Sequence, residues 1–417
     1  MRRTARLRAC AIAALAALAT TMALGAGAPA AQTPNPTNCQ NTGRFETWLE
    51  KFRRQAAAEG VSQATLSAVL DEMTLDPGII ARDRRQTFFG QSFVDFRAKL
   101  ISRNRLTNGQ RQMERHRATF ARAEKEYGVP AAVITGFWAL ESDFGAGMGK
   151  LSVLRSLATL AYDCRRGEMF TREFIAALKI IDRGDLKPAD MIGSWAGELG
   201  QTQFLPTHYL AHAVDYDGDG RRDLFSSPAD VIGSTAAYLK HLGWRAGEPW
   251  LEEVRAPRTL NWAEADLAIQ HPRSQWAKWG VTRADGKPLP ADALPASLLA
   301  LMGRDGPLFL AYDNFKVYLE WNQSLNYATT VAYLATRYAG APEMRDVGKD
   351  VPSLSLEQVK ELQTLLARRG HDVGRIDGIV GAGTRAAVKK VQLELGMVAD
   401  AYPTAELLEK LRSKRGR

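Results

Sequence analysis

Helical spacing of apolar residues dominates the first part of the chain. Over residues 45–127 apolar positions recur at intervals of three and four, and this spacing continues to Gly243. Residues 129–140 are almost wholly apolar and include Pro130, which suits the first turn of a helix. Helical spacing returns over residues 325–338. The pattern predicts a mainly α fold.

Two later stretches depart from this spacing. Between about 249 and 321, short segments broken by Pro and Gly end in an alternating run over 308–321, which predicts a small β-containing insertion. Residues 341–353 are polar and aperiodic and predict a linker. A separate unit at 354–411 follows, with three short helical patterns at 356–368, 383–395 and 404–411.

The first 31 residues have the composition of a targeting segment. Four arginines within residues 1–8 precede an Ala/Leu-rich run over 10–28, and small residues follow. This order is typical of a secretory signal peptide cleaved after Ala30 or Ala31. No later apolar run reaches the length of a membrane span. We therefore expect an exported, periplasmic protein with no stable membrane anchor.

The charge balance is only mildly basic. The chain has 55 Lys and Arg against 46 Asp and Glu, a net charge of +9, and four of those positive charges belong to the predicted signal peptide. Many of the remaining surplus cations lie in residues 410–417. A short basic tail of this kind does not indicate a nucleic-acid partner.

Two cysteines, Cys39 and Cys164, lie outside the predicted signal peptide. An even number of cysteines in an oxidising compartment favours a disulfide between them. Two separate buried thiols are the alternative.

One carboxylate stands at the end of the apolar segment. In AVITGFWALESDFG (132–145), Glu141 follows a run of apolar residues that spans a whole helix. Burial makes a carboxylate expensive to ionise, so its pKa should rise until it can donate a proton near neutral pH, as a glycosidase acid must. Asp143 would point elsewhere on a helix. The alternative is a helix-terminal glutamate that faces water.

A second segment, SWAGELGQTQFLP (194–206), is rich in glycine, amides and aromatic residues. It offers Gln201 and Gln203 to sugar hydroxyls and acetamido groups, and Trp195 and Phe204 to sugar faces. Considered alone, it is only a loop.

Together, the E-S-x-F-G helix end and the G-x-x-G-x-x-Q-F-x-P loop resemble the lysozyme-like domain of lytic transglycosylases, in detail the membrane-bound lytic transglycosylase B family. The resemblance extends through DYDGDGRRDLF (215–225), IGSTAAYLKHLGW (232–244) and WNQSLNYA (321–328). It implies a lysozyme-like catalytic domain over 40–340. Such a domain cleaves the bond from N-acetylmuramic acid to N-acetylglucosamine in peptidoglycan glycan strands without water, leaving 1,6-anhydro ends.

The resemblance also implies the roles of individual residues. It places the single catalytic acid and base on Glu141. It places substrate-binding residues on Ser194, Gln203, Phe204, Tyr238, Trp321, Asn322 and Tyr327. Trp321 stands where some relatives have Tyr, and Glu198 adds a carboxylate to the loop. We expect Glu141 to be the acid, since Glu198 follows Gly197 in a loop expected to be flexible.

An acidic motif lies between these segments. Asp215-x-Asp217-x-Asp219-Gly220 matches the start of an EF-hand loop, although Ser226 occupies the position of the closing glutamate. The expected ligands, the last of them aligned through the resemblance, are Asp215, Asp217, Asp219, Arg221, Asp223 and Asp230. We expect a structural Ca²⁺ or other cation here and no cofactor for the chemistry. An Asp/Gly turn without a metal is the alternative.

His208 and His212 stand four residues apart, as zinc ligands on a helix do. The zincin pattern requires Glu directly after the first His, and Tyr209 occupies that position. With no third ligand in view, a zinc site is not expected.

The C-terminal unit resembles the peptidoglycan-binding domain 1 family, a three-helix module. Residues 359–392 match its L-Q-x-x-L-x-x-x-G, D-G-x-x-G-x-x-T and A-V-x-x-x-Q landmarks. Val391 and Ala401 depart from the usual aromatic residue and glycine.

Three functions fit these observations. The first is a lytic transglycosylase with a wall-binding tail, and the second is a lysozyme-type muramidase on the same scaffold. The third is a noncatalytic peptidoglycan-binding scaffold. Glu141 argues against the third, since an abandoned site has no reason to keep an acid at the end of an apolar helix.

Overall fold

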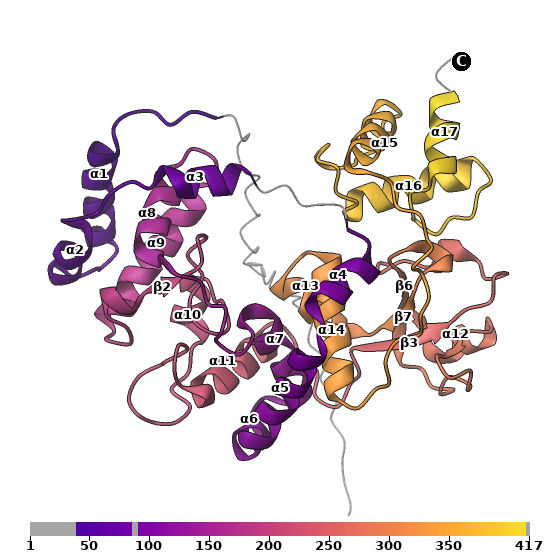
Figure 1. The fold of residues 1–417 in the computed structure, drawn as a ribbon, viewed down its shortest axis with the longest axis horizontal. Coiled ribbons are helices and arrows are strands. Elements are labelled where there is room, and N and C mark those ends of the chain that lie inside the picture. Colours follow the sequence, from indigo (N-terminus) through magenta and orange to yellow (C-terminus); the bar gives the residue numbers. More distant parts are fainter. Residues whose placement is uncertain (1–38, 86–90, 414–417) are drawn as a thin grey trace, which may run out of the picture.

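The computed structural model describes residues 39–85 and 91–413 and is built mainly of helices, as the sequence predicts (Figure 1). The proposed signal peptide lies outside the described residues. The α-helices are α1 (Phe45–Ala58), α2 (Gln63–Leu70), α3 (Pro77–Arg84), α4 (Phe93–Leu100), α5 (Arg103–Arg115), α6 (Arg117–Tyr127), α7 (Ala131–Ser142), α8 (Val153–Tyr162), α9 (Gly167–Asp182), α10 (Pro206–His212), α11 (Pro228–His241), α12 (Arg273–Lys278), α13 (Asp313–Trp321), α14 (Leu325–Tyr338), α15 (Leu356–Arg368), α16 (Ala382–Glu394) and α17 (Ala405–Ser413). The strands are β1 (Leu151–Ser152), β2 (Ile192–Gly193), β3 (Leu251–Arg255), β4 (His271–Pro272), β5 (Thr282–Arg283), β6 (Pro295–Ala300) and β7 (Leu308–Ala311).

Serine begins many of these helices. Its side chain accepts a hydrogen bond from the backbone N–H three residues on, which satisfies one of the free donors of the first turn. The serines that do this are Ser62, Ser92, Ser102, Ser152, Ser227, Ser324 and Ser355.

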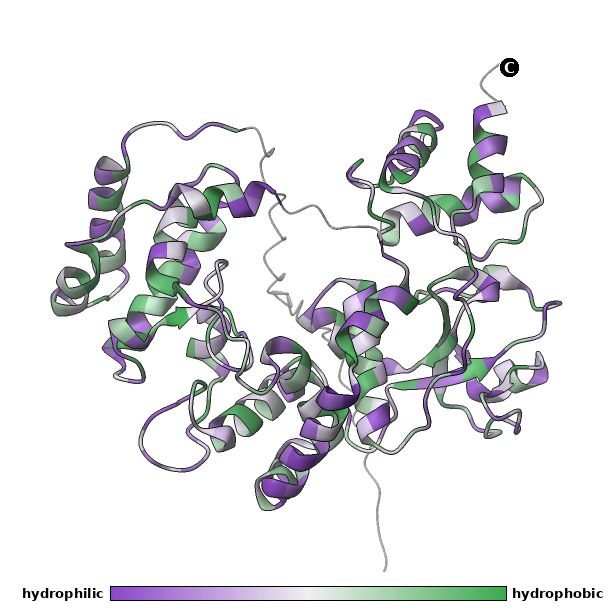
Figure 2. Cartoon of the chain, viewed as in Figure 1, coloured by the Kyte–Doolittle hydropathy of each residue, from purple (hydrophilic) through white to green (hydrophobic). Residues whose placement is uncertain are grey.

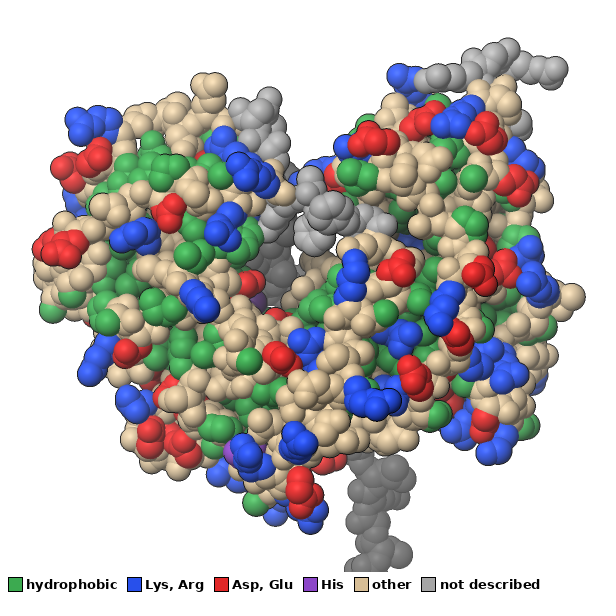
Figure 3. Space-filling view, viewed as in Figure 1, with side chains coloured by type: hydrophobic (Ala, Val, Ile, Leu, Met, Phe, Trp, Pro, Cys, Tyr) green, Lys and Arg blue, Asp and Glu red, His purple; other side chains and the backbone are tan. Residues whose placement is uncertain are grey.

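Two large hydrophobic cores lie among the helices that precede α15. The first lies among α1–α3 and α8–α10, and the second lies among α4, α6, α7, α11, α13, α14 and one face of a sheet. Trp321 and Leu242 pack against both cores. In the space-filling view, the face toward the reader is hollowed between these two parts (Figure 3). The outer helix α5 is largely hydrophilic, whereas the strands β6 and β7 are hydrophobic (Figure 2).

A five-stranded antiparallel sheet forms the insertion, in the order β4-β6-β7-β3-β5. Successive residues of a strand point to opposite faces. Accordingly, Leu299 and Phe309 pair in the second core, while Leu298 and Leu310 pair in a third core that includes Trp276 of α12.

The predicted strand at 308–321 is wrong in its second half. Strand β7 ends at Ala311, and helix α13 begins at Asp313. The apolar residues of this run fit both the two-residue period of a strand and the three-to-four-residue period of a helix. Phe315 and Tyr318, three residues apart, are buried together, and Asp313 lies in the first turn, where a helix dipole favours a carboxylate.

Cys39 and Cys164 form a disulfide across a sequence separation of 125, as expected. Asn41 Oδ1 accepts a hydrogen bond from the Cys164 N–H at 2.7 Å, and the Tyr162 hydroxyl donates to the Gly43 carbonyl at 2.9 Å. The N-terminal segment is thereby attached beside the connection between α8 and α9.

Helices α15–α17 have their own hydrophobic core and rest against the insertion. The half-buried Arg385 donates through its guanidinium to the carbonyls of Ala300 and Leu301 at 2.6 and 2.9 Å, and Lys389 pairs with Asp266 at 2.9 Å. The tethered module that the sequence suggests is therefore docked on the insertion.

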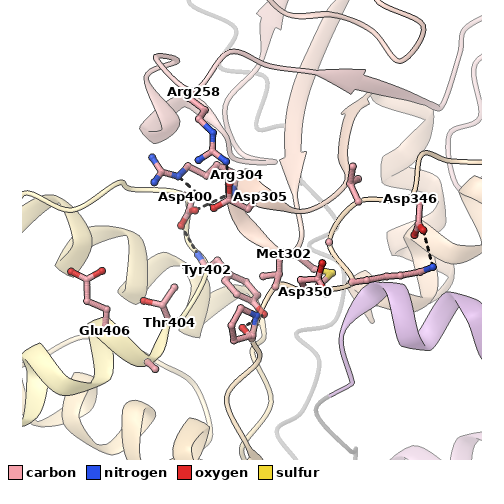
Figure 4. Close-up of a pocket in the computed structure, with 16 residues that line it drawn as sticks. Arg258, Met302, Arg304, Asp305, Asp346, Asp350, Asp400, Tyr402, Thr404 and Glu406 are labelled. Atoms are coloured by element: carbon pink, nitrogen blue, oxygen red, sulfur yellow. Dashed lines mark hydrogen bonds and ion pairs between the residues drawn. The ribbon is translucent and has the colours of Figure 1, made fainter.

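The segment at 341–353 contains no helix or strand. Its Arg345 pairs with Glu253 of β3 at 3.1 Å. A cavity of about 780 Å³ lies where the insertion, this segment and the C-terminal unit meet (Figure 4). On one side of it, Asp400 accepts a hydrogen bond from the Arg304 N–H at 3.1 Å. None of the helices in the described ranges is long and apolar enough to cross a membrane.

Candidate active site

Glu141 lies in the last turn of α7, a helix whose residues are nearly all buried. The helix ends at Ser142, and the next residue, Asp143, adopts a left-handed conformation with φ of 51°. The Asp143 carboxylate turns away to Arg105, whose Nε donates to it at 3.0 Å. The acid and its neighbour thus face different surroundings, as expected, although Asp143 lies beyond the helix and not on another face of it.

Two hydrogen-bond donors, one from α13 and one from α14, hold the Glu141 carboxyl group. The indole Nε1 of Trp321 donates to Glu141 Oε1 at 2.7 Å, and the Tyr327 hydroxyl donates to the same oxygen. In a neutral carboxyl group, the oxygen without the proton is the better acceptor. The acidic proton therefore belongs on Oε2, which leaves that oxygen for a leaving group.

The surroundings of Glu141 adjust its acidity. The residue is partly buried, and desolvation raises its pKa to about 7. The Tyr327 and Trp321 hydrogen bonds lower the pKa, and the negative charge of Glu198 raises it. A carboxyl group with this pKa can donate a proton at neutral pH and accept one afterwards.

The loop at 194–204 is attached to the end of α7. The Ser142 hydroxyl donates to the Gln201 carbonyl at 2.6 Å, and Gln203 Nε2 donates to the carbonyls of Gly200 and Met148 at 2.7 and 3.4 Å. Gln203 has a φ of 50°, which few side chains tolerate. The loop therefore has a defined position relative to the acid.

Gln201 does not offer its amide to a sugar, contrary to the prediction. Its Oε1 accepts from Trp138 Nε1 at 2.7 Å, and its Nε2 donates to the Phe225 carbonyl at 2.7 Å. The side chain is buried and joins α7 to the acidic loop. Trp195 packs against the first core.

An aromatic cluster supports Trp321. Its ring centroid lies 4.3 Å from Phe137, 5.3 Å from Tyr238 and 5.6 Å from Phe204. Phe204 is only 1% exposed, so in this structure its ring holds Tyr238 and Trp321 in place and offers no face to a sugar. Tyr238 is also largely buried.

Two further predicted substrate residues, Asn322 and Ser194, form hydrogen bonds within their own loops. Asn322 is exposed, and its Oδ1 accepts from the Ser324 N–H at 2.9 Å. The Ser194 hydroxyl donates to Glu198 Oε2 at 2.9 Å. The expected substrate contact Ser194 is thus bonded to Glu198, and no local pattern in this non-helical loop indicates that pairing.

Three histidines surround Tyr238. His208 and His212 of α10 each lie 4.9 Å from the Tyr238 ring, and His241 lies 6.3 Å from it, measured between ring centroids. Burial lowers the pKa of His208 and lowers that of His212 to about 4. In the described parts of the chain, these rings form no group with metal-binding spacing.

The acidic loop brings three of its predicted ligands together. Ligand atoms of Asp215, Asp217 and Asp219 lie within 4.8 Å of one another, which suits a divalent cation held by oxygen atoms. Their side chains also accept backbone N–H groups of the loop, for example Asp215 from Gly220 at 2.8 Å.

Asp223 and Asp230, in contrast, are occupied by the polypeptide. Both oxygens of the buried Asp230 accept backbone N–H groups, Oδ1 from Tyr216 at 2.6 Å and Oδ2 from Asp223 at 2.7 Å. Asp223 bonds to residues that follow it, including Phe225 N–H at 2.9 Å. The guanidinium group of Arg221 lies 3.6 Å from the Asp219 carboxylate. The structure thus gathers Asp215, Asp217 and Asp219 and leaves Asp223 and Asp230 as backbone acceptors.

Two family models match parts of this chain. The model of the transglycosylase SLT domain matches residues 44–336, and that of the putative peptidoglycan binding domain matches residues 355–411. The membrane-bound lytic murein transglycosylase B of Escherichia coli (strain K12) is 33% identical over 252 residues, which cover 60% of this chain and 68% of that protein.

Two solved structures extend the comparison. SltB3 from Pseudomonas aeruginosa in complex with NAG-anhNAM-pentapeptide is 42% identical with a TM-score of 0.82, covering 89% of this chain and 100% of that chain. The Escherichia coli lytic transglycosylase Slt35 in complex with calcium is 29% identical with a TM-score of 0.59, covering 70% and 92%.

Proposed function

The chain belongs to the lytic murein transglycosylases with a transglycosylase SLT domain, and we propose that Glu141 carries out their reaction here. The substrate is peptidoglycan, cut at the β-1,4 bond from N-acetylmuramic acid to N-acetylglucosamine. The product is a 1,6-anhydromuramoyl end. The observation that carries this proposal is one partly buried carboxyl group, with a pKa of about 7, that two donors hold through a single oxygen.

The reaction follows from this arrangement. The proton on Glu141 Oε2 moves to the glycosidic oxygen as the bond to C1 of the muramoyl ring breaks. The acetamido oxygen of the same ring stabilises the positive charge that develops at C1. The C6 hydroxyl oxygen then bonds to C1, and its proton returns to Glu141. The acid is restored, and no water is consumed.

A lysozyme-type muramidase is the second candidate, because the loop at 194–204 carries another carboxyl group, Glu198, whose charge raises the pKa of Glu141. Many glycosidases use two carboxyl groups, one of which activates water or attacks the sugar. Such an enzyme would leave hydrated, reducing ends.

Two further proposals concern a bound cation and the cellular location of the protein. A Ca²⁺ ion held by Asp215, Asp217 and Asp219 is supported by the clustering of their oxygen atoms. It would screen three carboxylates and stabilise the loop, with no part in the chemistry. A periplasmic location is supported by the composition of the first 31 residues and by the disulfide.

Mass spectrometry of digested sacculi tests the function. The wild-type protein should release muropeptides with 1,6-anhydro ends, and Glu141→Gln should release none while keeping the wild-type melting temperature. The exposed Glu72→Gln is the matched control and should behave as wild type. Hydrated ends as the only product would support the muramidase. Release at the wild-type rate by the Glu141 variant would exclude Glu141 as the acid.

A further inference from the structure

Helix α7 ends in a turn that usually contains glycine. The Asp143 N–H donates to the Ala139 carbonyl at 3.0 Å, and this bond closes the end of the helix. The Phe144 N–H donates to the Trp138 carbonyl at 3.4 Å. Asp143 and Phe144 have φ of 51° and 60°, in the left-handed region that favours glycine. Other contacts must therefore hold this turn, which begins two residues after Glu141.

Arg105 of α5 supplies such a contact. Its Nε donates to Asp143 Oδ1 at 3.0 Å, and its Nη1 donates to the Leu100 carbonyl. The Arg105 side chain is only 19% exposed, so water screens the ion pair in part. Because Leu100 also holds the guanidinium group, the ion pair fixes the position of Asp143 relative to α5.

The backbone of the same arginine is joined to α14. The Arg105 carbonyl accepts the Tyr338 hydroxyl at 2.8 Å. Helices α5 and α14 lie close together here, since a Cβ added to Gly109 would lie 2.3 Å from the Tyr338 side chain. Helices α7 and α14 also pack closely, since a Cβ added to Gly136 would lie 3.3 Å from Ala335. Arg105 therefore links the end of α7 to α14.

Helices α7 and α14 carry the two partners of one hydrogen bond in the active site. The Tyr327 hydroxyl of α14 donates to Glu141 Oε1 of α7. Movement of the last turn of α7 would take the Glu141 carboxyl group away from Tyr327. Arg105 forms no hydrogen bond with Glu141 or Tyr327, both of which the structure describes. It can act on them by holding their helices or through its charge.

We propose that the Arg105–Asp143 ion pair positions the catalytic acid. The pair holds the left-handed turn after α7 and thereby keeps Glu141 Oε1 on the Tyr327 hydroxyl and Oε2 free for the glycosidic oxygen. This inference rests on the proposed function. Arg105 and Asp143 are positioning residues, and no proton passes through either of them.

Kinetics on a soluble glycan test this role. Arg105→Met and Asp143→Ala should each lower kcat on the order of tenfold with little change in KM, because a displaced acid transfers its proton more slowly. Asp143→Asn should keep most of the activity, since asparagine tolerates the left-handed region and retains an acceptor for Arg105. The exposed Arg103→Met, in the same turn of α5, is the matched control and should behave as wild type. Unchanged kcat in Arg105→Met, or equal losses in the Asn and Ala variants, would overturn the proposal.

The pH profile separates positioning from charge. Burial raises the pKa of Glu141, and the Tyr327 hydrogen bond opposes this increase. A displaced Glu141 should therefore have a higher pKa and stay protonated to higher pH, so the alkaline limb should move upward in both Arg105→Met and Asp143→Ala. The direct effects of charge have opposite signs, because loss of a cation raises the pKa of a carboxyl group and loss of an anion lowers it. Shifts in opposite directions would show that only the charges act and would contradict positioning.

A double-mutant cycle tests whether the effect passes through Tyr327. In a Tyr327→Phe protein the hydrogen bond is already absent, so Arg105→Met should lower kcat by less than about twofold further, which would be strong coupling between the two sites. A full tenfold loss in that background, together with a lower melting temperature, would show a general structural role and would rule out this route.

A ¹³C NMR titration of the Glu141 carboxyl group gives a readout that needs no turnover. It should show the same upward pKa shift in Arg105→Met and Asp143→Ala, whichever products the enzyme makes. If these shifts occur but the wild-type protein yields no anhydro products, the proposed function is wrong and the positioning role stands. If anhydro products form and neither the pKa nor kcat responds to loss of the ion pair, the function stands and this inference is wrong.

Discussion

The indole N–H of Trp321 donates to the carboxyl group of Glu141 at 2.7 Å, across 180 positions of sequence. Trp321 also packs against the first and the second hydrophobic core. The acid therefore depends for its orientation on a residue that joins the two halves of the fold.

Trp321→Phe should lower kcat on a soluble glycan roughly tenfold, the order expected when one hydrogen bond to an ionisable group is lost. The phenyl ring keeps much of the packing against Phe137 and Tyr238. Because the indole hydrogen bond lowers the pKa of Glu141, its loss should also move the alkaline limb of the pH profile upward. Trp321→Tyr, which restores a donor, is the matched variant and should recover part of the rate. An unaltered pH profile in the Phe variant would contradict this orientation of the acid.

The pH dependence of the wild-type enzyme should follow Glu141. The acid must be protonated, so kcat should fall as pH rises through about 7, the pKa that burial gives this group. Tyr327→Phe removes a donor that lowers this pKa and should shift the fall to higher pH. Glu198→Gln should shift it in the opposite direction. Identical limbs in these two variants would mean that another group controls the profile.

Much of this site follows from local pattern. The apolar run before Glu141 predicts a buried helix that ends in a carboxylate with a raised pKa, and the structure has that arrangement. The helical periodicity also predicts the fold class, because each helix buries one face. Both inferences depend on residues close together in the sequence.

The parts that could not be predicted depend on contacts between distant segments. The composition of the 194–206 loop does not reveal that Gln201 is held by Trp138 or that Phe204 is covered by Trp321. The alternating run at 308–321 fits a strand and a helix equally well, and tertiary packing decides between them. Likewise, nothing near Arg385 in the sequence indicates that it reaches the end of β6.

Calcium should raise the melting temperature of metal-stripped protein, because a cation that binds only the folded loop stabilises it by mass action. Asp217→Ala should remove this increment, since Asp217 is one of three clustered carboxylates. Asp217 also accepts the Ser227 hydroxyl at 2.6 Å, so Ser227→Ala is the matched control. That variant should start from a lower melting temperature but keep the calcium response. No response in the wild-type protein would favour a metal-free Asp/Gly turn.

Removal of residues 354–417 should weaken the binding of sacculi and leave cleavage of soluble glycans largely intact. Every residue proposed for catalysis precedes this unit, so turnover of short soluble glycans should stay within about twofold of wild type. Binding to insoluble sacculi should weaken on the order of 100-fold, because two sites on one polymer reinforce each other. The truncated protein should also melt at a lower temperature. The deletion uncovers the carbonyls of Ala300 and Leu301, which Arg385 satisfies in the whole chain.

Arg385→Ala tests the docked arrangement without removing the module. It should lower the melting temperature and reduce the affinity for sacculi, because a loosened module no longer sits at a fixed position relative to the active site. Arg375→Ala, in the same module but largely exposed, is the matched control and should change neither. If Arg385→Ala binds sacculi as tightly as wild type, the two sites cooperate through the covalent connection alone. If truncation abolishes turnover of a soluble fragment, the C-terminal unit must instead complete the catalytic fold, since the insertion it covers shares β3, β6 and β7 with the second core.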